Sequence, residues 1–390
     1  MLELKAKNIV IATHVYATGP AQDLREYLLN NSVGKLLFIG HPLFWDEKLS
    51  GSGYEVYEKG ELKEEKYRKI KKNFALLVYS IDIALNIFWT WQKMPKSDLF
   101  IGCDNLNAFS GIVLRFFGKT KKVIYYVIDY NPKRFDIKIL NYFYHKLDQF
   151  CVRHADETWN LSPRMAQARK EYFGFSGGNQ ITVPIGIWFS RFPRLDFSQI
   201  EKHTLVFMGH ILEKQGVQYA LRAVPAVIGQ LPDFQFLVIG DGSYLEALKK
   251  QTKKLDIGKN VEFVGYVEKH SEVEKMLSKC AAAVALYEKY DESGALSFTN
   301  FSDPGKVKAY LAGGLPILLS DVAHNAREIE KRRCGFVISQ DKEEIAEKII
   351  ALLKDEKTLQ EYRKNAIAYA KEFDWEDIFE ENLIRLINQQ

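Results

Sequence analysis

Cysteine is scarce in this chain, and its spacing fits no cysteine-based site. Only four cysteines occur among 390 residues, and no two of them form a C-x-x-C pair. This pattern argues against a disulfide scaffold and against a structural zinc site, because both need several cysteines at short, regular spacing. Scattered, unpaired cysteines are typical of proteins in a reducing cytosol.

The sequence also lacks the signals of several other protein classes. It has no internal repeats, no low-complexity tract and no G-x-x-x-x-G-K-[ST] motif, which argues against a repeat array and against a P-loop. Its first residues run directly into an apolar strand without a cleavable signal pattern. We therefore expect a cytoplasmic protein.

A long charge-free run is missing as well. The most apolar stretch, residues 74–91, is interrupted by Asp82 and Asn86. An aspartate at the centre of a bilayer costs about 2.5–3.5 kcal/mol, which argues against a membrane span. We predict a buried helix here, and an amphipathic surface resting on anionic lipid is the alternative.

Positive charge is concentrated in the first half of the chain. Residues 1–190 have a formal net charge of +7 and the remainder has −3, within a total of +4. A basic cluster precedes the apolar stretch, which predicts peripheral contact with an anionic membrane; a random imbalance on solvated faces would give the same counts. The cluster consists of Lys66, Arg68, Lys69, Lys71 and Lys72.

Apolar strands alternate with helical patterns along most of the chain. Continuous apolar runs at 8–13, 98–102 and 122–130 are each followed by a loop and a helix pattern, and the same alternation continues from 204 to 319. Such alternation predicts parallel, doubly wound α/β sheets. A content of 47% hydrophobic residues over this length supports two full cores, hence two domains.

The stretch 302–321, SDPGKVKAYLAGGLPILLSD, carries the strongest local signal of a binding site. Asp303 is a suitable N-cap and Pro304 suits the first helical position, so a helix should begin here and end at two glycines. The free amides at its N-terminus, with Lys306 beside them, form a potential anion site. An ordinary helix–strand unit remains an equal reading of these residues alone.

This stretch resembles the donor-site segment of retaining GT-B glycosyltransferases of the family 4 type, which reads P-x-K-x-x-E-Y-L-A-x-G-x-P. The matching residues are Pro304, Lys306, Tyr310, Leu311, Ala312, Gly314 and Pro316. Further segments match in chain order, among them the family's exit from the first domain at 183–187 and its n-V-x-F-x-G-y-v strand at 260–267. The resemblance covers the second half of the chain closely and the first half loosely.

The resemblance implies a GT-B fold, in which two Rossmann-like domains face across a cleft. We expect an acceptor-side domain at 1–188, a linker at 189–203, a nucleotide-sugar domain at 204–375 and a terminal helix, 376–390, that returns to the first domain. The implied donor-binding residues are Gly19, Gly209, His210, Lys214, Gly242, Val264, Tyr266, Ser302, Asp303, Lys306 and Ala309.

Two residues are implied in catalysis. Asp129 matches an acidic position at the end of strand 122–130, near the reacting sugar, although capping of the following turn explains it equally well. Lys214 lies one residue before the position of the family's diphosphate-binding lysine, which Gln215 occupies. Two other positions depart from the family: His210 replaces an arginine, and Ala309 replaces the glutamate that grips the donor ribose.

The implied function is transfer of a sugar from a nucleotide sugar to a glycan or lipid-linked acceptor with retention of configuration. No carboxylate pattern typical of metal ligands occurs, so we expect neither a metal nor another cofactor, and no nucleic-acid partner. Two alternatives remain open. One is a non-catalytic nucleotide-sugar or glycan-binding subunit, because three family contacts are altered; the other is a nucleotide-sugar epimerase on the same fold.

Overall fold

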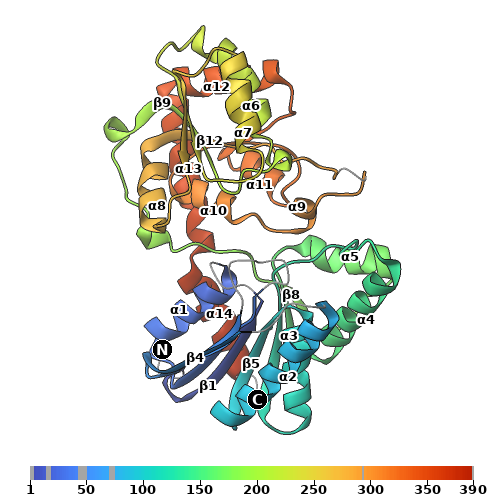
Figure 1. Cartoon of the computed structure of the whole chain (residues 1–390). Coiled ribbons are helices and arrows are strands. Elements are labelled where there is room, and N and C mark those ends of the chain that lie inside the picture. The colour runs from blue at the N-terminus through green and yellow to red at the C-terminus, as the bar shows by residue number, and fades with distance from the viewer. Residues whose placement is uncertain (1–3, 15–18, 43–50, 70–74, 292–293, 389–390) are drawn as a thin grey trace. The chain divides into compact units, whose positions relative to one another are not determined.

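A computed structural model shows the chain as two compact units, residues 1–184 with 378–390 and residues 185–377 (Figure 1). The structure describes all residues except 1–3, 15–18, 43–50, 70–74, 292–293 and 389–390. Each unit has one sheet with helices packed on it, so the predicted α/β fold with two Rossmann-like units is confirmed. The stretch 189–203, expected as a linker, falls within the second unit.

The sheet of the first unit has eight strands in the order β4-β3-β2-β1-β5-β6-β7-β8. Six of these pair in parallel. The apolar central residues of β1, β2, β5, β6 and β7 are almost fully buried, as expected for strands covered on both faces, whereas the edge strand β8 is only half-buried. The strands are β1 Asn8–Thr13, β2 Lys35–Gly40, β3 Gly51–Glu58, β4 Glu61–Lys69, β5 Ser97–Cys103, β6 Thr120–Val127, β7 Glu157–Asn160 and β8 Gln180–Thr182.

One side of this sheet carries an antiparallel addition that was not predicted. Strands β3 and β4 form an antiparallel hairpin that pairs with β2. The turn between them is Lys59-Gly60, with φ of 53° and 85°, the left-handed conformation that two-residue hairpins favour. The hairpin was missed because its strands are rich in charged residues. Lys66 and Arg68 of the predicted basic cluster are exposed on β4, whereas Lys71 and Lys72 lie outside the described residues.

Helices cover the first sheet, and three of them lie side by side on one face. Helix α3 packs on β5 and β6 and contacts α2 and α4 (Figure 1). Among the described residues no helix is both long enough and apolar enough to cross a membrane. The helices of this unit are α1 Pro20–Asn30, α2 Ala75–Lys93, α3 Asn105–Phe116, α4 Lys138–His154 and α5 Pro163–Phe173.

The second unit has a sheet of six parallel strands in the order β11-β10-β9-β12-β13-β14. Two buried apolar clusters pack in this unit, one including residues of α6 and α12, the other residues of α8, α10 and α13. The strands are β9 Glu201–Met208, β10 Gln235–Ile239, β11 Val261–Gly265, β12 Cys280–Ala285, β13 Ile317–Leu319 and β14 Gly335–Val337. The helices are α6 Val217–Ile228, α7 Leu245–Lys254, α8 His270–Lys279, α9 Phe298–Phe301, α10 Gly305–Ala312, α11 Ala326–Lys331, α12 Lys342–Lys354 and α13 Glu356–Ala370.

The last helix, α14 Trp375–Asn388, continues from the second unit into the first. Its Arg385 donates to the buried carboxylate of Glu157 on β7, with 2.8 Å between Nη2 and Oε2. Lys122 on β6 donates to the carbonyl of Leu386 at 2.7 Å. Since both partners belong to the first unit, the C-terminal turns of α14 are part of its fold.

Candidate functional site

Lys306 lies on the first turn of α10, close to the carboxyl end of β9. The helix is anchored there by Tyr310, one turn further on. The Tyr310 hydroxyl accepts a hydrogen bond from the Met208 amide at 2.7 Å and lies 3.3 Å from the Met208 carbonyl. This fully buried tyrosine therefore fixes the position of Lys306 relative to the end of the strand.

The ammonium group of Lys306 has no carboxylate partner among the described residues. It donates to Oε1 of Gln215 at 2.7 Å and lies over the rings of Phe207 and Tyr287, at 4.2 and 5.6 Å from their centroids. Burial lowers the pKa of Lys306 to about 7, and within the described part of the chain no negative charge raises it again. A desolvated cation without a counter-ion is costly, so this position favours an anionic ligand.

Two glycines bring the surrounding loops close to one another. Gly240, after β10, has a φ of +133°, and a Cβ there would lie 2.0 Å from the Gly209 carbonyl oxygen. Gly216, before α6, has a φ of +78°, and a Cβ would lie 1.9 Å from the Leu286 carbonyl oxygen. Any side chain at either position would push apart the loops that follow β9, β10 and β12.

The structure brings several of the predicted donor residues to this end of the sheet. Gly209 lies against Lys306, with 2.8 Å between the Lys306 Nζ and the place of a Cβ at Gly209. His210 lies against Gly242, with 2.8 Å between the His210 Cδ2 and the place of a Cβ at Gly242. Lys214 is exposed in the short turn Glu213–Gln215, and Tyr266 is 76% exposed just after β11, next to the half-buried Val264.

The prediction for Asp303 needs correction. Helix α10 begins at Gly305 with Pro304 as its N-cap, so Asp303 is not the cap. Its buried carboxylate accepts a hydrogen bond from the Ile185 amide at 2.9 Å, pairs with Lys308, and lies 3.1 Å from Nε2 of His324. Burial would raise the pKa of Asp303, but the charge of Lys308 and then His324 lower it. Because its partners are already inside the protein, Asp303 is not a free polar group for a ribose.

The two neighbouring predictions fall in different surroundings. Ser302 is buried, and its hydroxyl donates to the Thr299 carbonyl at 3.4 Å. Ala309 is half-buried on α10 and packs at the margin of an apolar cluster. Neither residue offers an exposed polar group in this structure.

The first unit contains a buried ionic network that the sequence pattern did not reveal. Asp82, on α2, lies between two histidines that follow strands β1 and β2. One carboxylate oxygen is 3.3 Å from Nε2 of His14, and the other is 3.1 Å from Nδ1 of His41. Ser52 donates to Asp82 at 3.1 Å, and Asn86 contacts Nε2 of His41 at 2.9 Å.

His14 connects this network to Asp104, at the carboxyl end of β5. Its Nδ1 lies 2.5 Å from Oδ2 of Asp104, which follows β5 and caps α3 by accepting from the Asn107 amide at 2.9 Å. Burial would lower the pKa of His14, but the charges and hydrogen bonds of Asp104 and Asp82 raise it to about 10. The two carboxylates therefore favour the protonated, positively charged form of His14. Asp104 has a φ of +132°, a strained value for a residue with a side chain.

Asp129 lies at the carboxyl end of the neighbouring strand, two residues after β6. Its carboxylate pairs with Arg134, and 39% of its side chain is exposed. Burial would lower the pKa of Arg134, but the charge of Asp129 raises it above its usual range. His14, His41, Asp104 and Asp129 thus follow four adjacent strands of one sheet, at the carboxyl ends where α/β sheets bind ligands.

A family model matches the second unit. Residues 196–373 match the model described as glycosyl transferases group 1. Among curated proteins, the poly(glycerol-phosphate) alpha-glucosyltransferase of Bacillus subtilis is 26% identical over 176 residues, which are 44% of this chain and 24% of that protein. This chain thus spans about a quarter of that relative's length.

Solved structures of the same fold align with nearly the whole chain. HepE of Anabaena in complex with UDP has a TM-score of 0.66 and 13% identity, with 97% of this chain and 99% of that chain covered. WaaG, a glycosyltransferase involved in lipopolysaccharide biosynthesis, has a TM-score of 0.69 and 14% identity, with 98% and 100% covered. At these identities the likeness shows the GT-B fold alone.

Proposed function

We propose that this chain, whose residues 196–373 match the glycosyl transferases group 1 model, moves a sugar from a nucleoside-diphosphate sugar to a hydroxyl-bearing acceptor with retention of configuration. The donor would bind at the Lys306 site of the second unit. The acceptor would bind at the carboxyl edge of the first sheet, near Asp104 and Asp129.

The unpaired cation at Lys306 is the observation that carries this proposal. A diphosphate would supply the negative charge that the described residues do not supply to it. The N-terminus of α6, next to Gly216, adds free amides and a positive dipole end. Fixed positive groups of this kind stabilise the charge that develops on a leaving diphosphate.

The chemistry then needs no protein nucleophile and no metal. The bond between the anomeric carbon and the diphosphate oxygen breaks as the acceptor oxygen attacks from the same face. The acceptor proton passes to the departing phosphate oxygen, and a nucleoside diphosphate is released. In this scheme Lys306 and Lys214 hold the leaving group, and Asp129 contacts the reacting sugar or the acceptor hydroxyl.

The similar proteins support a choice of donor carrier and of acceptor class. HepE was solved with UDP, which favours a uridine nucleotide as the donor carrier. The curated relative acts on poly(glycerol-phosphate), and WaaG acts in lipopolysaccharide biosynthesis. These names favour an acceptor that is a glycan or a lipid-linked polymer.

Release of nucleoside diphosphate from UDP-, GDP- and dTDP-sugars tests the proposal. The wild-type protein should release UDP from at least one UDP-sugar, and Lys306→Ala should lower the rate at least a hundredfold. Lys279→Ala, an exposed lysine of the same unit, serves as control. UDP binding without turnover, with any acceptor offered, would instead indicate a nucleotide-sugar-binding subunit.

A further inference from the structure

Helix α2 buries several polar side chains beside Val78, Leu85 and Trp89, and it exposes apolar ones. Its buried face carries polar side chains that join the network around His14 and His41, whereas its exposed face has no charged residue from position 77 to 92. The buried polar residues are Asp82, Asn86 and Thr90. The exposed and half-buried apolar residues are Leu77, Ala84, Ile87, Phe88 and Trp91. A helix on the surface of a water-soluble domain normally exposes charged and polar side chains instead.

Helix α4 likewise buries polar side chains and exposes apolar ones. Its buried face includes His145, Asp148 and Gln149, and Asp148 accepts two hydrogen bonds from the buried Arg169, at 2.7 and 2.8 Å. Its exposed face carries apolar and aromatic side chains together with four basic or ionisable ones, Lys138, Lys146, Arg153 and His154. The large exposed side chains at and just before this helix are Ile137, Ile139, Tyr142, Phe143 and Phe150.

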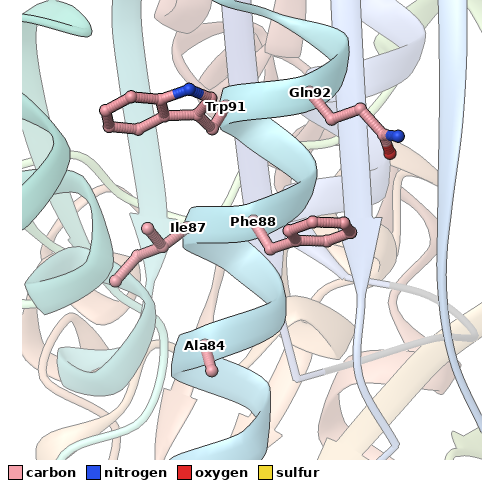
Figure 2. A pocket seen from close by; sticks show the side chains of 5 residues that line it. All are labelled: Ala84, Ile87, Phe88, Trp91 and Gln92. Carbon is pink, nitrogen blue, oxygen red and sulfur yellow. The ribbon is translucent and has the colours of Figure 1, made fainter.

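Helix α3 lies between these two helices and joins their apolar faces. Phe109 on α3 contacts Phe150 of α4, with ring centroids 5.9 Å apart, and Phe117, just after α3, contacts Trp91 of α2 at 6.4 Å. Phe116, at the end of α3, is 84% exposed. Figure 2 shows the shallow apolar groove along α2 that Ala84, Ile87, Phe88, Trp91 and Gln92 line.

Lysines border this apolar face. Lys119 lies 3.9 Å from the ring centroid of Trp91, and Lys146 lies 5.4 Å from that of Tyr142. Lys138 is exposed in the first turn of α4. The ion pairs recorded for the described residues include none of these three lysines, so their charges are available to an external anionic surface. Aromatic rings with lysines beside them are typical of surfaces that lie at a membrane interface.

We propose that the outer face of α2, α3 and α4 rests on an anionic lipid bilayer, with its aromatic side chains in the headgroup region and its lysines at the lipid phosphates. This inference concerns a surface of the first unit alone and does not depend on sugar transfer. It also moves the predicted membrane contact. Lys66 and Arg68 lie on β4, at the edge of the sheet, whereas the apolar face lies on the helices.

Co-sedimentation of the full chain with vesicles tests the proposal. The protein should bind vesicles of 70% phosphatidylcholine and 30% phosphatidylglycerol, and should bind pure phosphatidylcholine at least tenfold more weakly. Phe88→Ser combined with Phe143→Ser should lower binding at least tenfold. Lys138→Gln and Lys146→Gln should each lower it about fivefold, and these losses should shrink as salt is added.

Two substitutions in the second unit serve as matched controls for vesicle binding, and melting temperatures control for loss of folding. Tyr266→Ser and Tyr290→Ser remove aromatic side chains that are 76% and 54% exposed, and binding should not change. All variants should melt within a few degrees of the wild type because the substituted side chains are exposed. Equal binding by the face variants and the controls would overturn the proposal. The proposal would also be overturned if the protein does not bind vesicles but forms a dimer in sedimentation velocity that Phe88→Ser and Phe143→Ser abolish. A second copy of the chain would then cover the face.

Discussion

The two units bury charge at the carboxyl ends of their sheets in opposite ways. In the first unit, Asp82 lies between two histidines, and His14 lies between two carboxylates. In the second unit, Lys306 contacts an amide and two aromatic rings but no carboxylate of the residues that the structure describes. The first arrangement compensates its charges within the protein, and the second leaves one charge to be compensated from outside.

This difference separates structural charge from binding charge. A compensated network holds loops in place, and removing one member leaves another charge buried alone. An uncompensated cation destabilises the free protein and is neutralised when an anion binds. The position of Asp303 illustrates the same distinction, because Lys308 compensates its charge within the protein.

The largest effect should follow from breaking the compensated network. Asp82→Ala leaves His14 and His41 without their shared carboxylate, so we expect a loss of about 3–5 kcal/mol in the free energy of unfolding. Urea denaturation measures it. Glu61→Ala provides the control, because Glu61 is 76% exposed and pairs with the exposed Lys63, so its loss should leave the free energy of unfolding nearly unchanged. Equal stability of the two variants would show that the network contributes little.

Removing the uncompensated cation should give the opposite result. Lys306→Met keeps most of the side-chain volume but removes the charge, so the free protein should melt no lower than the wild type. UDP binding should weaken about 30- to 100-fold, which corresponds to about 2–2.7 kcal/mol. Calorimetric titration with UDP and melting curves with and without UDP measure both effects. A variant that melts much lower yet binds UDP normally would contradict the assignment of Lys306 to the ligand.

Alkaline pH should distinguish the two sites. The pKa of Lys306 is about 7, below the value in an unfolded chain, so the unfolded state binds more protons above pH 7 and this group makes stability rise with pH. The pKa of His14 is about 10, above its unfolded value, so its contribution is complete below about pH 6.5 and is lost as pH rises towards 10. The two contributions therefore oppose each other between pH 7 and 10.

Urea denaturation at several pH values separates them. In Lys306→Met only the deprotonation of His14 remains, and it lowers the free energy of unfolding as pH rises. The stability of this variant should therefore fall more steeply from pH 7 to 10 than that of the wild type. UDP binding to the wild type should weaken up to tenfold from pH 7.5 to 8.5, because the protonated fraction of Lys306 falls. Lys306→Arg keeps its charge over this range, and its affinity should stay constant. If the UDP affinity of the wild type and that of Lys306→Arg fall equally with pH, the pH dependence belongs to another group.

The sequence predicted the fold well because apolar periodicity is a local signal. The strands at 8–13 and 98–102, for example, are short apolar runs followed by a loop and a helix pattern, and both are parallel strands of the first sheet. The hairpin of β3 and β4 was missed because an edge strand rich in glutamate and lysine does not look like a buried one. For α2, the sequence predicted a buried helix, and an apolar helix does not reveal which of its faces is turned inward.

The site was less predictable because its contacts join distant parts of the chain. A histidine after a strand, such as His14, gives no sign that its partners will be Asp82 and Asp104. Asp303 matched a helix-capping pattern, yet its carboxylate pairs with Lys308, only five residues later. Lys306 was singled out by its motif, but its lack of a counter-ion became visible only in the structure.

The smallest expected effect tests the site from the other direction, by adding charge. Ala309 is half-buried on α10, the helix that begins beside Lys306. A carboxylate there would accept hydrogen bonds from ribose hydroxyls, and each charge-assisted bond contributes roughly 1.5–3 kcal/mol before the cost of desolvating the glutamate. We therefore expect Ala309→Glu to tighten UDP binding several-fold, and Ala309→Gln, which adds similar volume without charge, to tighten it less. Melting curves with and without UDP measure the change. If Ala309→Glu instead lowers the melting temperature by several degrees and UDP gives no compensating rise, the glutamate is buried without a partner, and the ribose lies elsewhere than on this face of α10.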